Sequence, residues 1–310
     1  MIRTPTTFVL GAGASIPLGM PSSGDLKEQI LNFPGGEVQQ LILDHAGVIG
    51  AELQEFQTSF RLSNASTIDQ FLEHNTDLRD LGKLLIAGVL LGKEHPNGVT
   101  DPNTASHPEH RNWLPYLFEH LNCQKVEEFA QNKVYFVTFN YDRTLEFALF
   151  QRLKHYYALD ALKAAEALKQ FEIIHLHGKL GELPELAAAA DQAVKFEGVK
   201  NPSEVIRASK MIRVIHDEDI SDKDPEFIRA RELLHSTERL VFLGFGFADD
   251  NCNRLGLRTL SGKPVYCSTF NLTWAEMNSI KRQFNPQVSL NWEVGNYGIS
   301  DYLKRWNPLS

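Results

Sequence analysis

Four short segments of the sequence place glycine, amide, imidazole and carboxylate groups at the ends of apolar runs. They are GAGASIPLGMPS (11–22), TFNYD (138–142), HLHG (175–178) and LGFGFADDN (243–251). Glycines directly after an apolar run let the backbone turn tightly and approach a bulky group, very often a phosphate. The amide of Asn140 offers a hydrogen-bond donor and an acceptor, and the imidazole of His177 can accept a proton near neutral pH. This combination suits the binding of a phosphorylated ligand and a reaction that involves one of its hydroxyl groups or a water molecule.

These segments follow runs that are predicted to be buried strands. The runs are TTFVL (6–10), VYFVTF (134–139), FEIIHLH (171–177), RLVFLGFG (239–246) and PVYCSTF (264–270), with VSLNW (288–292) as a sixth candidate. Their nearly continuous apolar character is typical of strands covered on both faces in a parallel sheet. The predicted fold class is therefore α/β, a Rossmann-like doubly wound parallel sheet with helical insertions. Because ligands of such a sheet bind beyond the carboxyl ends of its strands, the four segments are expected to converge on one crevice.

The chain is predicted to fold as a single domain over residues 1–310 because its 43% hydrophobic content can form a substantial core. The Rossmann-like core is expected over about 1–24, 133–180 and 236–310. A helical insertion is expected over about 25–132, with helices at 66–85, capped by Ser66 or Thr67, and at 113–130, and with a buried helix at 84–92. A helix should cross the sheet over 143–169, and a smaller insertion over about 181–235 should contain helices at 203–217 and 225–236.

Composition and charge exclude several classes of protein. A formal net charge of −8 argues against direct nucleic-acid binding, which rewards clustered Lys and Arg. Cys123, Cys252 and Cys267 lie far apart without a CxxC pair, so neither a disulfide framework nor a bound metal is predicted. The longest apolar run, at 84–92, is too short to cross a bilayer, and a cytoplasmic protein without membrane association is expected.

Two common nucleotide-binding patterns are not matched. In the dinucleotide fingerprint G-x-G-x-x-G the third glycine position is Ile16, and a helical region stands where the second strand should follow. The dehydrogenase interpretation is therefore weak. No G-x-x-x-x-G-K-[ST] is present, which removes the usual ATPase option.

The order of GAGxS with a following G-x-P, T-x-N-x-D, an HG and a late glycine-rich strand end resembles the sirtuin-like superfamily from residue 8 to about 251. Protein-deacylating sirtuins carry Asp-Phe-Arg after the G-x-P, a Gln before the Asn, and a four-cysteine zinc module. Here Ser22 and Ser23 follow Pro21, Phe139 precedes Asn140, and the zinc module is missing. The pattern is more similar to the bacterial sirtuin-like proteins of antiphage defence, which hydrolyse NAD.

The resemblance implies a role for each matched position. Asn140 and His177 would be catalytic, with Asp142 orienting Asn140 or the ribose; His177 is preferred to His175 because it directly precedes Gly178, as in the family motif. The residues that would contact NAD, the substrate, are Gly11, Ala12, Gly13, Ser15, Pro21, Thr138, Gly244, Gly246, Phe247, Asp249 and Asn271. The backbone N–H groups of the first four would meet the diphosphate.

Ordinary structural roles remain open for the same residues. The glycines of the first segment would also suit a simple turn, and Asn140 or Asp142 would cap a helix starting near Arg143. His177 would serve equally as a buried structural histidine. Asp249, Asp250 and Asn251 would serve as a helix cap, Phe245 and Phe247 would pack in a core, and Ile68, Phe71 and Leu72 are interpreted as a core stripe.

The predicted function is NAD glycohydrolysis, which yields nicotinamide and ADP-ribose or its cyclic form. A non-catalytic sensor of NAD or ADP-ribose, a protein deacylase and an assembly subunit are the alternatives. Because a constantly active NAD hydrolase would poison its cell, control by homo-oligomerisation or by a partner is expected. The resemblance suggests a HerA-like ATPase or a short Argonaute as that partner.

Overall fold

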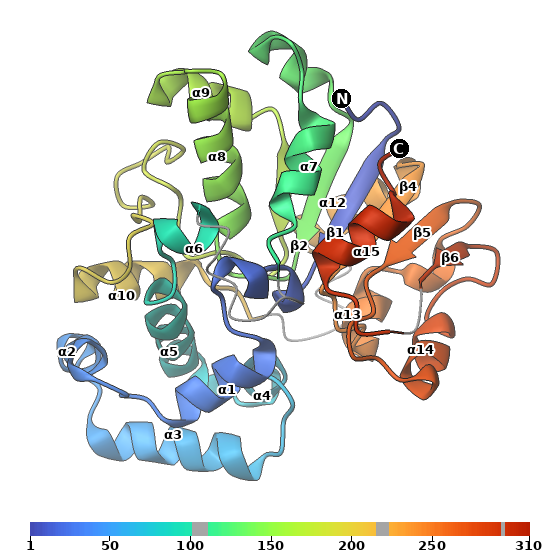
Figure 1. Ribbon diagram of the computed structural model, residues 1–310. Helices are drawn as coiled ribbons and strands as arrows, with labels where there is room; N and C mark the ends of the chain where they lie inside the picture. The colour runs from blue at the N-terminus through green and yellow to red at the C-terminus, as the bar shows by residue number, and fades with distance from the viewer. Residues whose placement is uncertain (101–110, 215–222, 293–294) are drawn as a thin grey trace.

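Six parallel strands form one sheet at the centre of the molecule, in the spatial order β3-β2-β1-β4-β5-β6 (Figure 1). The computed structural model describes residues 1–100, 111–214, 223–292 and 295–310. The strands are β1 (Thr6–Leu10), β2 (Val134–Thr138), β3 (Glu172–His175), β4 (Arg239–Leu243), β5 (Pro264–Cys267) and β6 (Ser289–Asn291). This order is that of a Rossmann-like fold, in which the winding of the chain reverses between β1 and β4. The structure confirms the predicted α/β class and the predicted parallel sheet.

The helices are arranged around this sheet and begin in several places at a side-chain cap. At the start of α4, for example, Thr67 Oγ1 accepts a hydrogen bond from the N–H of Gln70, and Asp224 caps α12 in the same way. Within the described residues the α-helices are α1 (Ser23–Leu31), α2 (Glu37–Ala46), α3 (Gly50–Leu62), α4 (Ile68–His74), α5 (Arg79–Leu91), α6 (Pro96–Thr100), α7 (Leu114–Leu121), α8 (Thr144–Tyr156), α9 (Ala161–Leu168), α10 (Pro202–Met211), α12 (Pro225–Ser236), α13 (Asp249–Arg254), α14 (Trp274–Lys281) and α15 (Ile299–Trp306).

Each face of the sheet is covered by its own helices, because alternate residues of a strand point to opposite faces. In β1, Phe8 and Leu10 join a core with side chains of α7, α8 and α15. Val9, between them, joins a second core with side chains of α12, α13 and α14. Figure 1 shows α7 and α15 in front of the sheet and α12 behind it. The sheet is therefore doubly wound, as the apolar runs predicted.

Four predicted helices differ from the structure in their limits. The helix predicted over 113–130 is divided into α7 and a 3₁₀ helix (Val126–Gln131), because Asn122 leaves the helical conformation. The predicted helix 66–85 is divided into α4, a 3₁₀ turn (Thr76–Leu78) and α5, because Asn75 leaves the helical conformation and its side chain donates to the carbonyl of Phe71. The side chain of Arg79 then caps two further carbonyls at the end of α4. The helix predicted over 143–169 is divided into α8 and α9. The helix predicted over 203–217 ends at Met211, and residues 215–217 lie outside the described ranges.

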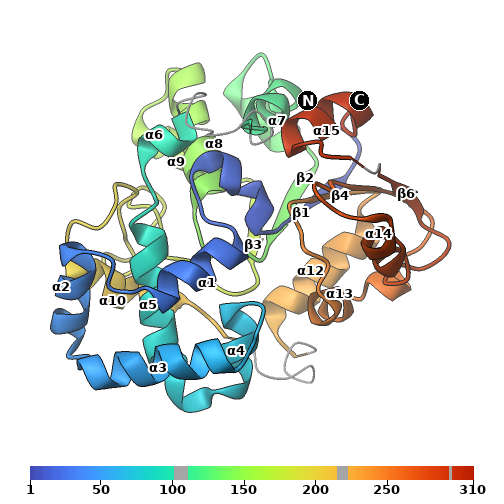
Figure 2. The ribbon, with the colours of Figure 1, turned by 60° about the horizontal axis from the view of Figure 1, so that its bottom comes forward.

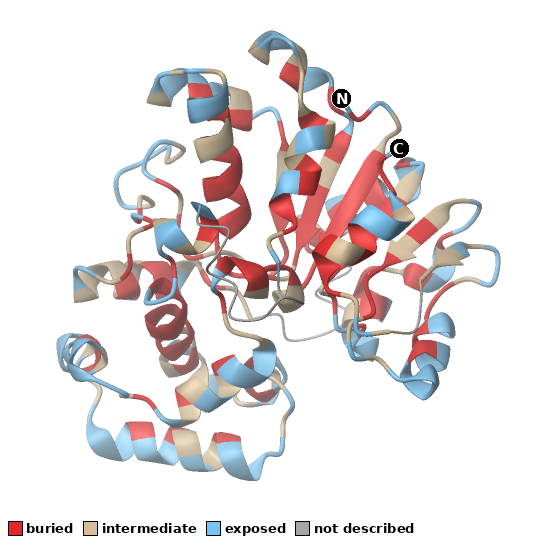
Figure 3. Ribbon diagram, viewed as in Figure 1, coloured by how far each residue is buried: buried red, intermediate tan, exposed pale blue. Residues whose placement is uncertain are grey.

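Helices α1 to α5 form a separate layer beside the sheet, and α10 packs into the same layer (Figures 1 and 2). The two segments interpreted as separate insertions thus share one apolar core. Helix α5, which includes the predicted buried run, is buried along most of its length (Figure 3). Among the described residues, no helix has both the length and the apolar character that crossing a membrane requires.

A buried ion pair joins this helical layer to the sheet. Glu94, just after α5, pairs with Arg143, at the start of α8, and both side chains are almost completely inaccessible to solvent. The backbone N–H of Arg143 also donates to Glu94 Oε1 at 2.8 Å, and its Nη1 donates to the carbonyl of Val194 at 2.6 Å. Because these contacts connect three parts of the chain, they fix the helical layer against the end of β2.

Candidate active site

The loop after β1 packs directly against the loop after β4, where the winding of the sheet reverses. A Cβ atom on Gly11 would lie 2.5 Å from the carbonyl oxygen of Gly244, and one on Gly13 would lie 2.7 Å from its Cα. Gly244 itself has a φ of +58°, and its own Cβ would meet the nitrogen of Ala14 at 2.1 Å. Only glycine fits at these positions. The small residues in the first segment are therefore explained by contact between two backbones.

Most N–H groups of this loop are used inside the protein. The N–H of Gly11 donates to the carbonyl of Leu243 at 3.1 Å, and that of Gly13 donates to the carbonyl of Gly244 at 3.0 Å. The N–H of Ser15 donates to the carbonyl of Ala12. The N–H groups of Gly11, Gly13 and Ser15, which were predicted to contact a diphosphate, thus already donate to carbonyls of the protein. Of the four predicted positions, Ala12 is the one whose N–H has no such partner among the described residues, and its contact with a diphosphate stays a prediction.

The same loop is anchored on its other side and leads into α1. The indole N–H of Trp113, a fully buried side chain, donates to the carbonyl of Ala14 at 2.8 Å. Gly19 has a φ of +92°, which turns the chain toward Pro21. Ser22 then forms a capping box with Asp25 at the start of α1. The serine at this position is therefore explained by helix capping.

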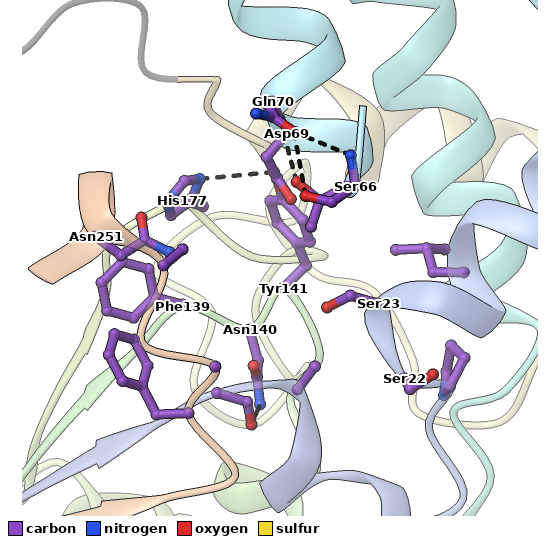
Figure 4. Close-up of a pocket in the computed structure, with 18 of the residues that line it drawn as sticks. Ser22, Ser23, Ser66, Asp69, Gln70, Phe139, Asn140, Tyr141, His177 and Asn251 are labelled. Carbon is purple, nitrogen blue, oxygen red and sulfur yellow. Dashed lines mark hydrogen bonds and ion pairs between the residues drawn. The ribbon is translucent and has the colours of Figure 1, made fainter. Parts of the chain in front are cut away.

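The side chain of Asn140 is held in one orientation by its amide nitrogen. Nδ2 donates to the carbonyl of Gly11 and to Ser15 Oγ, each at 3.0 Å. Both of its hydrogens are then used, so Oδ1 is the group that Asn140 presents to a ligand. Figure 4 shows the amide nitrogen turned toward the loop and the oxygen turned away from it. The sequence predicts that the amide of Asn140 offers a ligand both a donor and an acceptor, but in the structure only the acceptor, Oδ1, remains available.

Asp142, Ser15 and Thr138 support Asn140 from behind. Ser15 Oγ donates to Asp142 Oδ1 at 3.1 Å, and that oxygen also accepts the N–H of Thr144, the first residue of α8. Thr138 Oγ1 accepts the backbone N–H of Asn140 at 3.0 Å. Burial raises the pKa of Asp142, although the hydrogen bonds from Thr144 and Ser15 oppose this effect. Asp142 therefore orients Asn140 through Ser15 and caps α8.

His177 is buried, but neither nitrogen of its ring has a hydrogen-bond partner. The residue is 4% exposed, and Phe139 and Tyr141 contact the ring, with centroids 5.6 Å and 6.1 Å away. Among the described residues, the nearest carboxylate oxygen is Asp69 Oδ1, 3.7 Å from Nδ1. Burial lowers the pKa of His177, because a charged ring loses hydration there, while the charge of Asp69 opposes the shift. The surroundings therefore favour the neutral form of the ring, and both of its nitrogens are unused.

His175, two residues earlier, has both ring nitrogens engaged. Nδ1 lies 2.9 Å from the carbonyl of Asn140, and Nε2 lies 2.7 Å from Glu146 Oε1. Burial opposes ionisation of Glu146, yet the charges of His175 and Lys179 lower its pKa to about 2. His175 thus holds the backbone of Asn140 and lines no part of the cavity described next.

A cavity of about 240 Å³ lies between the sheet and the helical layer (Figure 4). Its lining brings together the following predicted residues: Gly11, Ala12, Pro21, Asn140, Asp142, His177 and Gly246. Carboxylates also reach it from the helical layer and from α13. Arg254, which pairs with Glu73 at 2.7 Å, is its only lysine or arginine in the described part of the chain. The charged side chains in the cavity wall are therefore mostly acidic.

One side of the cavity is formed by α4 and its N-terminal cap, which the sequence analysis did not connect with a site. Ser66, Asp69, Gln70 and Glu73 line the cavity. Their spacing of three, four and seven residues places them on one face of the helix. The apolar residues between them form the core stripe that was predicted there. The sequence signal that could have identified this wall of the cavity is a polar stripe at helical spacing beside the apolar one.

A second cavity, of about 220 Å³, adjoins the first and shares Phe245 and Gly246 with it. Gly13, Gly244 and Ser268 are also in its wall. Five predicted ligand-binding or supporting positions line neither cavity: Ser15, Thr138, Phe247, Asp249 and Asn271.

These five positions have other surroundings. Ser15 and Thr138 support Asn140, as described above. Phe247 is buried among other aromatic rings, and Asp249 accepts a hydrogen bond from Gln283. Asn271 is exposed beside the second cavity. Phe247 packs in the core, as the alternative interpretation proposed, and its contact with a ligand stays a prediction.

Fold and site together define an α/β protein of Rossmann-like type with a cavity at the crossover of its sheet. Residues 134–264 match the family model described as the SIR2-like domain. This match supports the sirtuin-like family and indicates a function related to NAD, since SIR2-like domains are typically NAD-dependent enzymes. The comparison with curated proteins found no match.

The matched segment runs from the start of β2 to the first residue of β5. It contains Asn140, Asp142, His177 and the end of β4, whereas the β1 loop and α4 lie outside it. In the described residues, no three His, Cys, Asp or Glu side chains are grouped so that they could hold a metal ion.

Proposed function

We propose that this protein is an NAD glycohydrolase that cleaves the bond between nicotinamide and ribose. The observation that carries the proposal is the meeting of Asn140 and His177, from two different strand ends, on one cavity at the crossover of the sheet. Buried side chains in a natural protein are rarely left without partners, so an unpartnered imidazole in a cavity wall is a candidate for contact with a substrate.

The reaction makes limited demands on the protein. The pyridinium of NAD leaves as neutral nicotinamide when the electron pair of the C–N bond moves to the ring nitrogen, so no general acid is needed. Positive charge develops at the anomeric carbon, as in other glycosyl transfers. A water forms the new C–O bond and gives up a proton, and the products are ADP-ribose, nicotinamide and that proton. A ribose hydroxyl in place of the water gives the cyclic product.

Both side chains suit these demands. Asn140 Oδ1 is an acceptor for a ribose hydroxyl or for the attacking water, and its partial negative charge favours a positive sugar. An unprotonated nitrogen of His177 accepts the proton that the nucleophile loses. The carboxylates in the wall add further negative potential beside the developing cation.

The shape of the site supports a ligand with two halves. The two cavities meet at Phe245 and Gly246, next to the crossover between β1 and β4. A side chain at Gly246 would meet no atom within 4 Å, so the space around it is open. We propose that the nicotinamide half binds in the first cavity and the adenosine half in the second.

The experiment is release of nicotinamide from NAD by the purified protein, alone and with candidate activators. Asn140→Ala should lower the rate by about 10²-fold to 10³-fold, which is the usual loss when one positioned polar group is removed. Asn253→Ala is a matched control, because Asn253 is exposed on α13 and lines neither cavity. Turnover that is equal in wild type and Asn140→Ala would refute the proposed site.

We further propose that the enzyme acts in antiphage defence by depleting NAD, under control of self-association or of a partner such as a HerA-like ATPase or a short Argonaute. Val38, Leu41 and Ile49 are more than half exposed on the helical layer and offer an apolar contact surface. The proposal predicts a change in mass on activation, measurable by light scattering with and without candidate partners. A monomer that is fully active without any trigger would contradict it.

A further inference from the structure

The environment of His177 contains a carboxylate that comes from the helical layer. Asp69, on α4, lies with Oδ1 3.7 Å from Nδ1 of the imidazole. The hydroxyl of Tyr141 donates a hydrogen bond to the same oxygen (Figure 4). The distance to the ring exceeds the usual length of a hydrogen bond, about 2.9 Å, by less than 1 Å. A small movement of α4 toward the ring would close it.

We infer that Asp69 and Tyr141 form a positioning pair for His177, and that the helical layer thereby completes the active site. The inference rests on the proposed function, in which His177 accepts a proton. In the closed arrangement Nδ1–H donates to Asp69, so that Nε2 is left unprotonated and faces the substrate. Asp69 acts through His177 and is a positioning residue.

The geometry around the ring favours this tautomer. Asp69 is the only carboxylate that the structure places within 4 Å of an imidazole nitrogen of His177 in the described residues. Tyr141 keeps its proton, because burial and the neighbouring Asp69 raise its pKa well above the ordinary value, and it can therefore only donate to the carboxylate. The phenol thus fixes one oxygen of Asp69 beside the ring.

Two cationic side chains near His177 act on its pKa in the direction opposite to Asp69. Arg254, from α13, and Arg213, which follows α10, both lower the pKa of the imidazole, as burial does. In the described part of the chain, Asp69 is the group that raises it. The charge of Asp69 therefore acts against burial and the two cations and makes the ring a stronger base than it would be without this carboxylate.

Helix α4 is suited to transmit substrate binding to this pair. Its polar face lines the cavity, so a bound substrate contacts the helix that carries Asp69. A second link, between Glu73 and Arg254, holds the other end of the helix against α13. Closure of the gap between Asp69 and His177 then accompanies occupation of the cavity.

The test compares Asp69→Asn and Tyr141→Phe with wild type in nicotinamide release as a function of pH. Asp69→Asn keeps the size of the side chain but removes the charge that favours the imidazolium, so the acid limb of kcat/KM should move to lower pH. The plateau should fall about 10-fold to 100-fold. Tyr141→Phe should lower the plateau by a smaller factor without moving the limb downward, since the carboxylate remains.

Matched controls are Asp77→Asn and Tyr156→Phe, whose side chains are exposed and line neither of the two cavities. An acid limb in Asp69→Asn that coincides with that of wild type, with a plateau within twofold, would overturn the inference while Asn140→Ala still tests the proposed function. A lowered melting temperature with an unmoved limb would also overturn it, because it would indicate a purely structural role.

A measurement without turnover separates the two proposals. The pKa of His177 can be followed by NMR of labelled histidine in the protein without NAD, with the signal assigned by its loss in His177→Gln. Asp69→Asn should lower this pKa, and Asp77→Asn should leave it unchanged. An equal pKa in Asp69→Asn and wild type contradicts the positioning pair, whether or not the protein releases nicotinamide.

Discussion

The two histidines of the HLHG segment are two residues apart and equally buried, yet their surroundings are opposite. His175 has an acceptor at each nitrogen, the carbonyl of Asn140 and the carboxylate of Glu146. His177 has no hydrogen-bond partner at either nitrogen and stands in the wall of the cavity. The first is a structural residue of the site, and the second is available to a ligand.

This contrast shows how the fold separates support from chemistry. Successive residues of an extended segment point in opposite directions, but these two are separated by Leu176, so alternation alone would place them on the same side. The strand ends at His175, and Gly178 has a φ of +71°, so the chain turns immediately afterwards. The turn after β3 is what separates their environments.

The largest expected effect is the loss of activity in His177→Ala. Removing a general base typically lowers the rate by 10²-fold to 10⁴-fold, and we expect about 10³-fold in nicotinamide release. The unfolding free energy should fall less than in His175→Ala, since packing of the ring is lost but no hydrogen bond or ion-pair partner of a buried group is removed. Rate and urea unfolding measured on the same preparation check both parts.

The counterpart, His175→Ala, should show the reverse pattern. It leaves the buried carboxylate of Glu146 without its main partner, which typically costs about 3 kcal/mol or more. The rate of the folded fraction should fall less than in His177→Ala, because Asn140 keeps its contacts with Gly11 and Ser15. Equal losses of rate in the two variants would remove the distinction between them.

Much of the fold could be predicted from the sequence, because buried parallel strands are nearly continuous apolar runs. The runs predicted over 6–10, 134–139 and 239–246 contain the neighbouring strands β1, β2 and β4, and the ends of these strands meet at one crevice. Motif order also pointed to Asn140 and His177 as members of one site. These inferences depend on local pattern and on the general rule that parallel strands present their carboxyl ends together.

Other features depend on contacts between distant segments and could not be predicted. Gly11 and Gly13 have a role that requires the position of Gly244, more than two hundred residues later. Asp69 belongs to a helix whose apolar stripe was correctly interpreted, but the target of its polar face is visible only once the helical layer is docked. A sequence pattern shows which face is polar, not what it meets.

A smaller expected effect concerns the pH dependence of stability that Glu146, the partner of His175, contributes. Glu146 has a folded pKa of about 2 against an ordinary value of 4.5, so its contribution to stability is fully present above about pH 4.5. It is lost as pH falls toward 2, because the unfolded chain binds the proton first. Between pH 6 and pH 3 we expect this one group to account for about 2 kcal/mol of the lost stability.

The matched variant is Glu146→Gln, measured against wild type by urea unfolding at a series of pH values. Other carboxylates titrate in both proteins, so the difference between the two curves isolates Glu146. That difference should be largest near pH 6 and should shrink by about 2 kcal/mol toward pH 3. A difference that stays constant with pH would mean that Glu146 is not ionised beside His175. The difference between His175 and His177 would then be supported only by the unpartnered ring nitrogens of His177.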